Sequence, residues 1–213
     1  MRDLSLLLVV AFFSFTVYSQ SENYPLGMYM NLQEVLSKQP SVNHNVELEQ
    51  RSPGKIKMNG GNDYQLNSED KAVKRSFLFK EVYAYSEGSD LYLNCMNFEL
   101  QAWYARVEGE NRNYFFFKAG IPMNAKRYGY KSSDLSNMFG GVVGAFGAAK
   151  RAMIRLPYLL EKKSGEVVLV THKNIDNYLN NAPQLRDAYH NEPENESLDV
   201  ISDNLQQWMD LEE

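Results

Sequence analysis

The residues that most often carry out chemistry are few in this sequence and stand far apart. None of the three histidines, His44, His172 and His190, has a second histidine four residues on or a Cys-x-x-Cys pair beside it. Zinc ligands usually come in closely spaced pairs, so the sequence predicts no zinc site. No segment has the Asp-x-Asp-x-Asp-Gly spacing of a calcium loop. We therefore expect the chain to hold no metal and no other cofactor.

Candidates for catalysis are also weak. The Gly-x-Ser-x-Gly motif of the α/β-hydrolases is absent. The single cysteine, Cys95, has no histidine near it in the sequence to activate it, so we expect a buried apolar residue. The carboxylate pairs fall on predicted exposed strand faces or turns, where such pairs are normally solvated: Glu47/Glu49, Glu69/Asp70 and Glu108/Glu110. An enzyme remains an alternative, but its site would not be visible in the sequence.

One predicted loop, between residues 120 and 136, combines basic and aromatic side chains. These are Lys126, Arg127, Tyr128, Tyr130 and Lys131. Such a surface favours contact with an anionic glycan, a lipid headgroup or a protein. The competing interpretation is structural, with the tyrosines covering an edge of the sheet.

A segment rich in glycine and alanine, Met138–Ala149, carries no charge. Small residues recur every four positions at Gly140, Gly144, Ala148 and Ala152, and on a helix they would form one smooth stripe. The glycine spacing matches neither phosphate-binding fingerprint. The segment is also too short to span a bilayer, which takes about 20 apolar residues. Tight packing on the sheet is the leading interpretation, and membrane contact, self-association and a flexible loop are the alternatives.

The first residues predict the compartment. Arg2 precedes an apolar run from Leu4 to Val17, and small or neutral residues follow as far as Ser19. This is the plan of a secretory signal peptide over residues 1–19, cut between Ser19 and Gln20, although an uncleaved anchor is an alternative. We expect residues 20–213 to form a single secreted or periplasmic domain. With one cysteine, that domain has to fold without an internal disulfide.

Charge is distributed unevenly along the chain. From Asp187 onward there are nine acidic residues and no lysine or arginine, whereas Gln20 to Arg186 contains 21 basic and 17 acidic residues, a balance of +4. We expect the acidic C-terminal part to be a solvated helical surface. A secreted chain with a net charge of −5 is a poor candidate for binding nucleic acid.

Short strands dominate the first two thirds of the predicted fold. After a helix capped by Asn31 and Glu34, residues alternate in several segments joined by short turns, which predicts a largely antiparallel sheet or half-barrel. The predicted strands span residues 44–49, 55–58, 64–66, 77–85, 91–95, 103–107, 114–117 and the two arms of a hairpin around Ser164-Gly165. The aromatic run 114–117 should be covered on both faces. Pro157 predicts that its strand lies at an edge.

Helices are expected after the hairpin. Ile175, Tyr178 and Leu179 share one face, and Pro183 can start a second helix. A third helix carries a clean apolar stripe at Leu198, Ile201, Leu205 and Trp208. The predicted fold class is therefore α+β, with a packed small-residue segment and short C-terminal helices.

Two segments resemble known proteins. They are the opening Gly27-x-Tyr29-x-Asn31-x-x-Glu34 and the block from Tyr158 to Val167, which is followed by Ala182-Pro183-Gln184-Leu185. They are similar to an uncharacterised family of secreted Bacteroidota proteins of unknown function. In this chain, Glu166 stands where that family's pattern has a basic residue. The resemblance implies an exported protein and supplies no catalytic residue.

Together these observations favour an exported, non-catalytic domain that binds a partner or supports the cell envelope. A glycan, an envelope component or a protein would suit it as a partner. The first alternative is a peripheral membrane or self-associating protein that uses residues 138–149. The second alternative is an enzyme.

Overall fold

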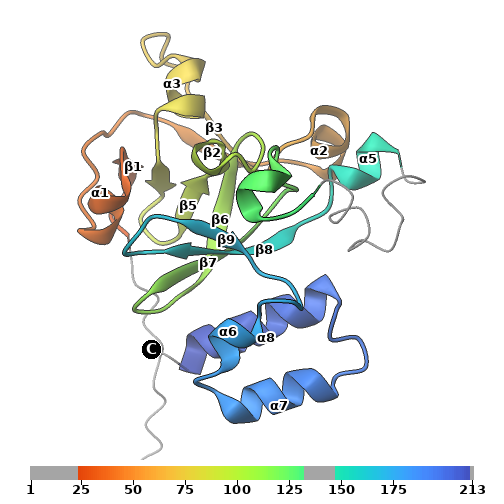
Figure 1. Cartoon of the computed structure of the whole chain (residues 1–213). Coiled ribbons are helices and arrows are strands. Elements are labelled where there is room, and N and C mark those ends of the chain that lie inside the picture. The colour runs from red at the N-terminus through yellow and green to blue at the C-terminus, as the bar shows by residue number, and fades with distance from the viewer. Residues whose placement is uncertain (1–23, 132–146, 212–213) are drawn as a thin grey trace, which may run out of the picture.

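The chain forms an α+β fold built on one antiparallel sheet, as the sequence predicts. Figure 1 shows the computed structural model, which describes residues 24–131 and 147–211. The strands are β1 (Gly27–Tyr29), β2 (Glu47–Gln50), β3 (Tyr64–Asn67), β4 (Ala84–Ser86), β5 (Leu91–Asn94), β6 (Tyr104–Glu110), β7 (Tyr114–Ala119), β8 (Leu156–Glu161) and β9 (Val167–Leu169). Their order in the open sheet is β1-β4-β5-β6-β7-β8-β9, and the β2–β3 hairpin joins through a pairing of Tyr64 with Tyr104.

Short helices surround the sheet. They are α1 (Leu32–Leu36), α2 (Pro53–Asn59), α3 (Arg75–Lys80), α5 (Ala148–Arg151), α6 (Asp176–Leu179), α7 (Pro183–Asn191) and α8 (Leu198–Leu211). The 3₁₀ helices η1 (Cys95–Phe98) and η2 (Ala125–Tyr128) lie in the connections. In the described ranges 24–131 and 147–211, no helix has the length and apolar character needed to cross a bilayer.

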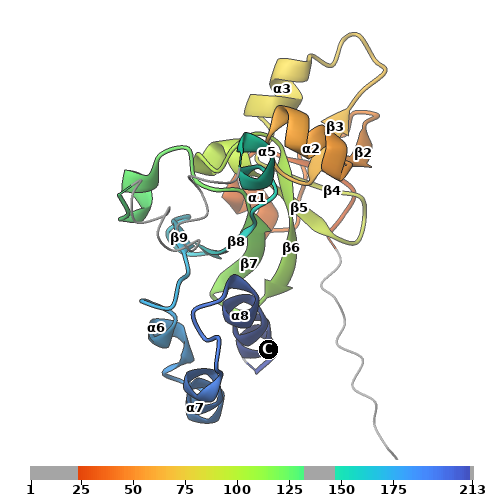
Figure 2. The ribbon, with the colours of Figure 1, turned by 90° about the vertical axis from the view of Figure 1, so that its right-hand side faces the viewer.

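Strand β6 links the two halves of the sheet. Its first residues, Tyr104–Arg106, pair with β5, and the residues from Val107 to Glu110 pair with β7. The register shifts between Val107 and Gly109, which marks a bulge. A bulge bends and twists its strand, and the two halves run in visibly different directions in Figures 1 and 2.

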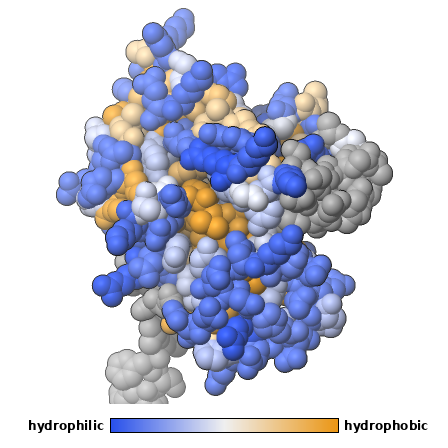
Figure 3. Space-filling view, viewed as in Figure 1, coloured by the Kyte–Doolittle hydropathy of each residue, from blue (hydrophilic) through white to orange (hydrophobic). Residues whose placement is uncertain are grey.

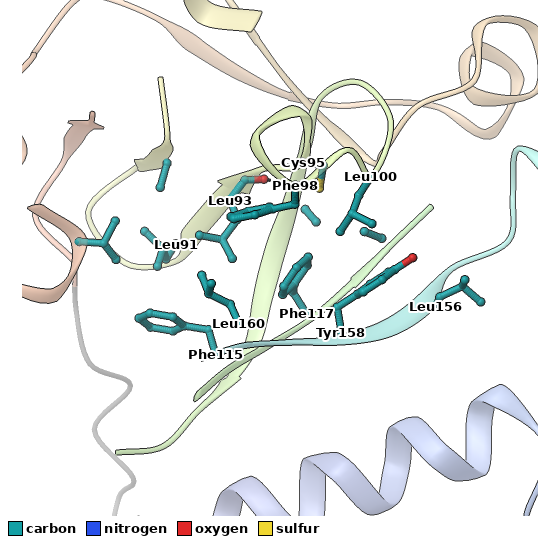
Figure 4. Close-up of a cluster of buried hydrophobic side chains, with 14 of the residues drawn as sticks. Leu91, Leu93, Cys95, Phe98, Leu100, Phe115, Phe117, Leu156, Tyr158 and Leu160 are labelled. Carbon is teal, nitrogen blue, oxygen red and sulfur yellow. Dashed lines mark hydrogen bonds between the residues drawn. The ribbon is translucent and has the colours of Figure 1, made fainter. Parts of the chain in front are cut away.

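The main core lies on one face of this bent sheet. Phe115 and Phe117 from β7 meet Tyr158 from β8, and Phe117 and Tyr158 stack with ring centroids 5.7 Å apart. Phe98 from η1 closes over them (Figure 4). Phe116, between the two phenylalanines, points to the opposite face and is also buried. The prediction that residues 114–117 are covered on both faces is confirmed.

The C-terminal helices cover that opposite face. Ile201, Leu205 and Trp208 of α8 are buried with Phe116 and Leu159, which confirms three of the four residues of the predicted stripe. Leu198, the fourth, is half-buried and packs against the main core cluster. The outward side of α6–α8 is almost wholly hydrophilic in Figure 3. All seven described acidic residues from position 187 onward are exposed, as predicted: Asp187, Glu192, Glu194, Glu196, Asp199, Asp203 and Asp210.

A third cluster fills the space between the sheet and the β2–β3 hairpin. It contains Met28, Tyr85, Tyr92 and Tyr104 from the sheet and Leu78 from α3. Leu78 is 2 % exposed. The three apolar clusters therefore cover both faces of the sheet.

Two predicted strands are helices. Residues 55–58 lie inside α2, because Ser52 caps the helix by accepting a hydrogen bond from the Lys55 backbone N–H and Pro53 suits the first turn. Only Ile56 is buried. The connection between the predicted strands 55–58 and 64–66 starts at the end of this helix, where the C-cap residue Gly60 has φ +65°.

Residues 77–85 were predicted as one strand, and they form the end of α3 followed by β4. The helix ends at Lys80. Leu78 is the one buried residue of α3, so its apolar pattern is too sparse to identify the helix.

The prediction that Pro157 lies on an edge strand is also wrong. Strand β8 pairs with β7 on one side and β9 on the other. The Pro157 carbonyl accepts a hydrogen bond from the Val170 backbone N–H, at 3.0 Å. In an antiparallel sheet the backbone nitrogen and carbonyl of one residue face the same neighbouring strand, so the Pro157 nitrogen also faces the β9 side. It lies opposite Val170, just beyond Leu169, the last residue of β9, where a backbone N–H is not needed for the ladder. A proline is therefore tolerated in this internal strand.

Candidate functional site

Polar and charged side chains from four separate segments meet around Gly61, directly after α2. We call this group the Gly61 site: Arg51, Gly61, Asn62, Asp63, Gln101, Trp103 and Arg155. Gly61 has φ +88°, and a Cβ atom there would lie 2.9 Å from both Arg51 Nη1 and Trp103 Cδ1. Position 61 therefore requires glycine for its conformation and for the close approach of its neighbours.

Asn62 holds the site together. Its side chain is fully buried and donates to the carbonyls of Leu100, at 2.9 Å, and Ala102, at 3.0 Å. Its Oδ1 accepts a hydrogen bond from the Gly120 backbone N–H at 2.7 Å. One amide thus satisfies three backbone groups from two other loops, which fixes the position of the Gly60–Asp63 segment.

The neighbouring segment, Glu99–Trp103, has an unusual backbone. Glu99, Gln101 and Trp103 have φ values of +58°, +74° and +77°. Such values are uncommon outside glycine and cost of the order of 1–3 kcal/mol per residue. Gln101 secures the segment, since its Oε1 accepts from the Gly61 N–H at 3.2 Å and its Nε2 donates to the Ile121 carbonyl at 2.9 Å. Backbone strain of this kind occurs preferentially at functional sites.

Two arginines differ sharply in their partners. Arg155 holds the Asp63 carboxylate through two hydrogen bonds, Nε to Oδ2 at 2.9 Å and Nη2 to Oδ1 at 2.7 Å. Arg51 is 5 % exposed, and its Nη1 donates to the Asn62 carbonyl at 2.7 Å. The Arg51 Nε is buried and has no hydrogen-bond partner among the described residues.

Positive charge exceeds negative charge at this site. The pKa of Arg51 is lowered, first by burial and then by the nearby Arg155 cation, although Asp63 and Glu49 act in the opposite direction. Glu49 is already engaged by Lys55 and Asn67.

The guanidinium group of Arg75 adds to the excess of positive charge near the Gly61 site. Arg75 lies over the Trp103 ring at 5.0 Å from its centroid. Trp103 is itself 7 % exposed and packs edge-on against Phe79. Of these three arginines, Arg155 is the one that is hydrogen-bonded to the Asp63 carboxylate.

The described acidic side chain at the Gly61 site is Asp63, and both of its carboxylate oxygens accept hydrogen bonds from Arg155. Cys95 lies close to the site, but burial raises the pKa of its thiol well above the usual value, and the residue is fully buried as predicted. In the described part of the chain, no group of three His, Cys, Asp or Glu side chains could hold a metal ion.

The predicted basic and aromatic loop lies beside this site. Tyr128 donates to the Phe98 carbonyl at 2.5 Å and packs on Tyr158, and Tyr130 shares a 3.0 Å hydrogen bond with Thr171. Both tyrosines are half-buried, which agrees with the structural interpretation.

The basic residues of this loop are exposed. They are Lys126, Arg127 and Lys131. Arg127 pairs at 2.9 Å with Glu99, the first residue of the strained segment. Contact of this surface with a partner stays a prediction.

Half of the predicted small-residue stripe falls outside the described residues. Gly140 and Gly144 lie there, Ala148 begins α5, and Ala152 follows that helix and is half-buried. The Ala152 carbonyl accepts a hydrogen bond from Arg155 Nη1 at 2.9 Å. The end of the stripe thereby helps to position an arginine of the Gly61 site, and α5 packs beside α2 (Figures 1 and 2).

One carboxylate pair differs from its prediction. Glu110 is partly buried, bonded to Lys162 at 2.5 Å and to the Tyr24 hydroxyl at 2.8 Å. Its partner Glu108 forms an ion pair with Lys118 at 2.9 Å. The two carboxylates therefore have separate structural partners.

Two Ser-x-x-Lys spacings, typical of some serine nucleophiles, also occur in the sequence. They begin at Ser52 and Ser68. Ser52 caps α2, and Ser68 donates to the Asn45 carbonyl while accepting from the Asp70 N–H. Both serines have turn or cap roles.

The fold defines the class, an antiparallel α+β protein, and its Gly61 site brings together two guanidinium groups and one carboxylate. The chain belongs to a family of unknown function (DUF6563), whose profile matches residues 27–212. Searches of curated proteins and of solved structures find no match.

Proposed function

We propose that this chain is exported and acts by binding a ligand rather than by catalysis. The Gly61 site carries the binding part of the proposal. It combines a buried arginine that lacks a full set of partners, a strained backbone segment and an aromatic ring. Strain and incomplete hydrogen bonding both lower stability, and proteins retain them mainly where function requires them.

The export part of the proposal rests on the first residues. Residues 1–19 have the charged start, apolar centre and small-residue end of a signal peptide, with the Ser19–Gln20 bond as the cleavage site. The similarity to secreted Bacteroidota proteins supports the same compartment. Release into the periplasm or the medium would place the Gly61 site where envelope or glycan ligands are found.

Cell fractionation tests export directly. The full chain, expressed in a Gram-negative host, should be recovered in the periplasm or the medium with Gln20 as its first residue, as measured by intact mass. A matched variant, Leu7→Arg, should remain in the cytoplasm because a charge interrupts the apolar centre of the signal peptide. Cytoplasmic recovery of the unprocessed wild-type chain would contradict the proposal.

The membrane-associated alternative has one supporting observation. Met58 is 84 % exposed on α2, next to Lys57 and beside α5, whose last turn contains Lys150 and Arg151. An exposed apolar side chain among basic residues favours contact with an anionic membrane surface. Cell fractionation also distinguishes a freely released protein from a membrane-associated one, because a peripheral protein sediments with membranes and is released by high salt.

The enzyme alternative finds little support at the Gly61 site. A general base there would have to be Asp63, and Arg155 keeps both of its oxygens occupied. Binding is therefore the function that the geometry favours.

A further inference from the structure

Three strands, β1, β2 and β9, lie at the outer edges of the sheet, and the protein's own groups cover part of two of these edges. At β1, the backbone N–H and C=O of Met28 both bond to Val42, at 2.8 and 3.3 Å. At the end of β9, the Asn174 side chain donates to the Leu169 carbonyl at 3.0 Å and accepts from the Thr171 N–H at 2.7 Å. Groups that are occupied in this way are protected from pairing with another chain.

Strand β2 has no such cover, and its outward backbone groups belong to Leu48 and Gln50. Hydrogen-bonded and non-hydrogen-bonded pairs alternate along an antiparallel ladder, and the Arg51 N–H donates to the Asp63 carbonyl at 2.7 Å. Glu49 therefore bonds to β3, while the N–H and C=O of Leu48 and Gln50 point away from it. The described residues supply no hydrogen-bond partner to these four outward groups.

The outer edge of β2 is also accessible. Glu47 and Gln50 are exposed, and Leu48 and Glu49 are half-buried. Figure 2 shows β2 at the outer border of the molecule, beside β3. An extended chain can therefore lie along β2 and bond to the four free backbone groups, which is the recognition mode called β-strand addition.

The two faces of β2 differ in chemistry and define what an added strand should carry. Leu48 and the preceding Val46 pack on one face, against the apolar cluster beneath the β2–β3 hairpin. The other face carries Glu49, which is paired with Lys55, and Glu47, whose carboxylate has no ion pair with a described residue. Side chains on neighbouring strands interact directly across the ladder, so apolar residues suit the first face and basic residues suit the second.

A second copy of this chain is a poor occupant of this edge. Two β2 strands that pair around a two-fold axis at Leu48 would place Glu47 opposite Glu49 of the other copy. An axis at Glu49 would place the two Glu49 side chains opposite each other. Like charges directly opposite each other destabilise a strand pair, so the charges favour a different, basic partner.

We propose that β2 is a docking edge for an extended segment of another protein, in which basic and apolar residues alternate. The segment bonds to the N–H and C=O groups of Leu48 and Gln50, and its basic side chains lie beside Glu47. The inference goes beyond the binding function proposed above, because it depends neither on the Gly61 site nor on export.

Amide hydrogen exchange, measured residue by residue with NMR, tests the inference. In the free ¹⁵N-labelled chain, the Leu48 and Gln50 amides should exchange rapidly, whereas the Glu49 amide is bonded to β3 and should be protected. The probe is the peptide acetyl-Lys-Val-Lys-Val-Lys-Val-Lys-amide. At saturation it should slow exchange at Leu48 and Gln50 by about tenfold or more and leave Glu49 unchanged. The same peptide with glutamate in place of lysine should give no protection.

Variants on the edge separate its backbone from its charge. Gln50→Pro removes an outward N–H that the ladder with β3 does not use, so the variant should fold and should weaken binding of the lysine peptide by about tenfold or more. Glu47→Lys should weaken the lysine peptide by about threefold or more and improve binding of the glutamate peptide. Glu192→Lys makes the same charge change at an exposed position after α7 and should alter neither affinity.

Three results would overturn the inference. Slow exchange at Leu48 and Gln50 in the free, dilute chain would mean that the edge is closed. Equal protection by the two peptides, or protection by neither, would contradict the assigned partner chemistry. Protection that rises with protein concentration in the absence of peptide would identify a second copy as the occupant. If Gln50→Pro does not fold, the charge exchange at Glu47 still decides between these outcomes.

Discussion

Glu34 shows how one side chain can secure the start of the fold. Its carboxylate accepts hydrogen bonds from the Met30 backbone N–H at 2.8 Å, the Ser41 hydroxyl at 2.9 Å and Asn31 Nδ2 at 3.0 Å. Asn31 Oδ1 in turn accepts from the Glu34 N–H, so the predicted capping pair is present. The reciprocal bond goes to the Met30 N–H rather than to the N–H of the cap residue itself.

Glu34→Gln should make the stability less dependent on pH. Burial alone raises the pKa of Glu34, but the hydrogen bonds from Met30 and Ser41 outweigh it, and the pKa lies below its usual value. A lowered pKa in the folded state means stability that is present above about pH 4.3, the value for an unfolded glutamate, and is lost as the pH falls through the folded-state pKa. At pH 7 we expect the variant to be about 1 kcal/mol less stable, limited by solvent screening at this partly exposed position.

Urea unfolding at pH 7 and at pH 3 measures this effect. The difference between wild type and Glu34→Gln should shrink at the lower pH. Glu47→Gln, at an exposed position, should show no such difference. An equal loss for Glu34→Gln at both pH values would contradict the assigned role of the carboxylate.

Asn62→Ala should be among the most damaging single substitutions. It leaves the buried Leu100 carbonyl and Gly120 N–H without their partner, whereas the Ala102 carbonyl keeps its hydrogen bond from the residue-62 backbone N–H at 2.8 Å. We expect a loss of about 2 kcal/mol or more, because each unsatisfied buried group costs about 1–3 kcal/mol. Asn177→Ala, at an exposed position of α6, should change stability by no more than about 0.5 kcal/mol. Similar unfolding midpoints for the two variants would show that the Asn62 network is unimportant.

Strand β6 and helix α8 approach closely at Gly109. A Cβ at this position would lie 3.1 Å from Met209 Cγ and 3.3 Å from Gln206 Nε2. Gly109→Val should therefore push α8 away from the sheet and destabilise the fold by about 1–3 kcal/mol.

Gly54→Ala is the matched control for Gly109→Val. Gly54 lies within α2, and an added Cβ would meet only Ser52 Oγ, at 3.9 Å. Alanine is the better helix former, so this variant should gain up to about 1 kcal/mol. Thermal unfolding of both variants gives the answer. A Gly109→Val variant as stable as wild type would mean that α8 packs more loosely than the structure shows.

Elements were predictable from sequence where one face carried a dense apolar pattern. The aromatic run of β7 and the stripe of α8 are such cases, and both were identified correctly. Prediction failed at α2 and α3, since each buries a single residue, Ile56 or Leu78. Over four to six residues, one buried position fits a strand as well as a helix. The error at Pro157 has a different origin. An internal strand can hold this proline because β9 ends before the position opposite it, and the end of β9 is not visible in the sequence around Pro157.

At the scale of the whole molecule, the predicted α+β class with a mainly antiparallel sheet is confirmed. The sheet is covered on both faces by three apolar clusters, and the acidic C-terminal helices face solvent. Local sequence patterns were sufficient to predict the fold class, since short strands joined by short turns favour antiparallel pairing.

The Gly61 site could not have been predicted in the same way. Its residues come from positions 51, 61–63, 101–103 and 155, which are distant in sequence and carry no recognised motif. Two signals were present but were interpreted differently. Gly60 and Gly61 connect two segments predicted as strands, 55–58 and 64–66, and the predicted interaction loop is a neighbour of the site through the Arg127–Glu99 pair. Only the tertiary structure shows that Arg51 is buried without a carboxylate.

The central claim is that Arg51 is retained for binding at a cost in stability. Arg51→Met replaces the buried cation with an apolar side chain of similar length, and its free energy of unfolding in urea is the most direct test. The claim predicts a stability within about 1 kcal/mol of wild type, or higher, because removing an incompletely paired buried charge offsets the lost hydrogen bond to Asn62. A loss above about 3 kcal/mol would contradict it and make Arg51 a structural residue.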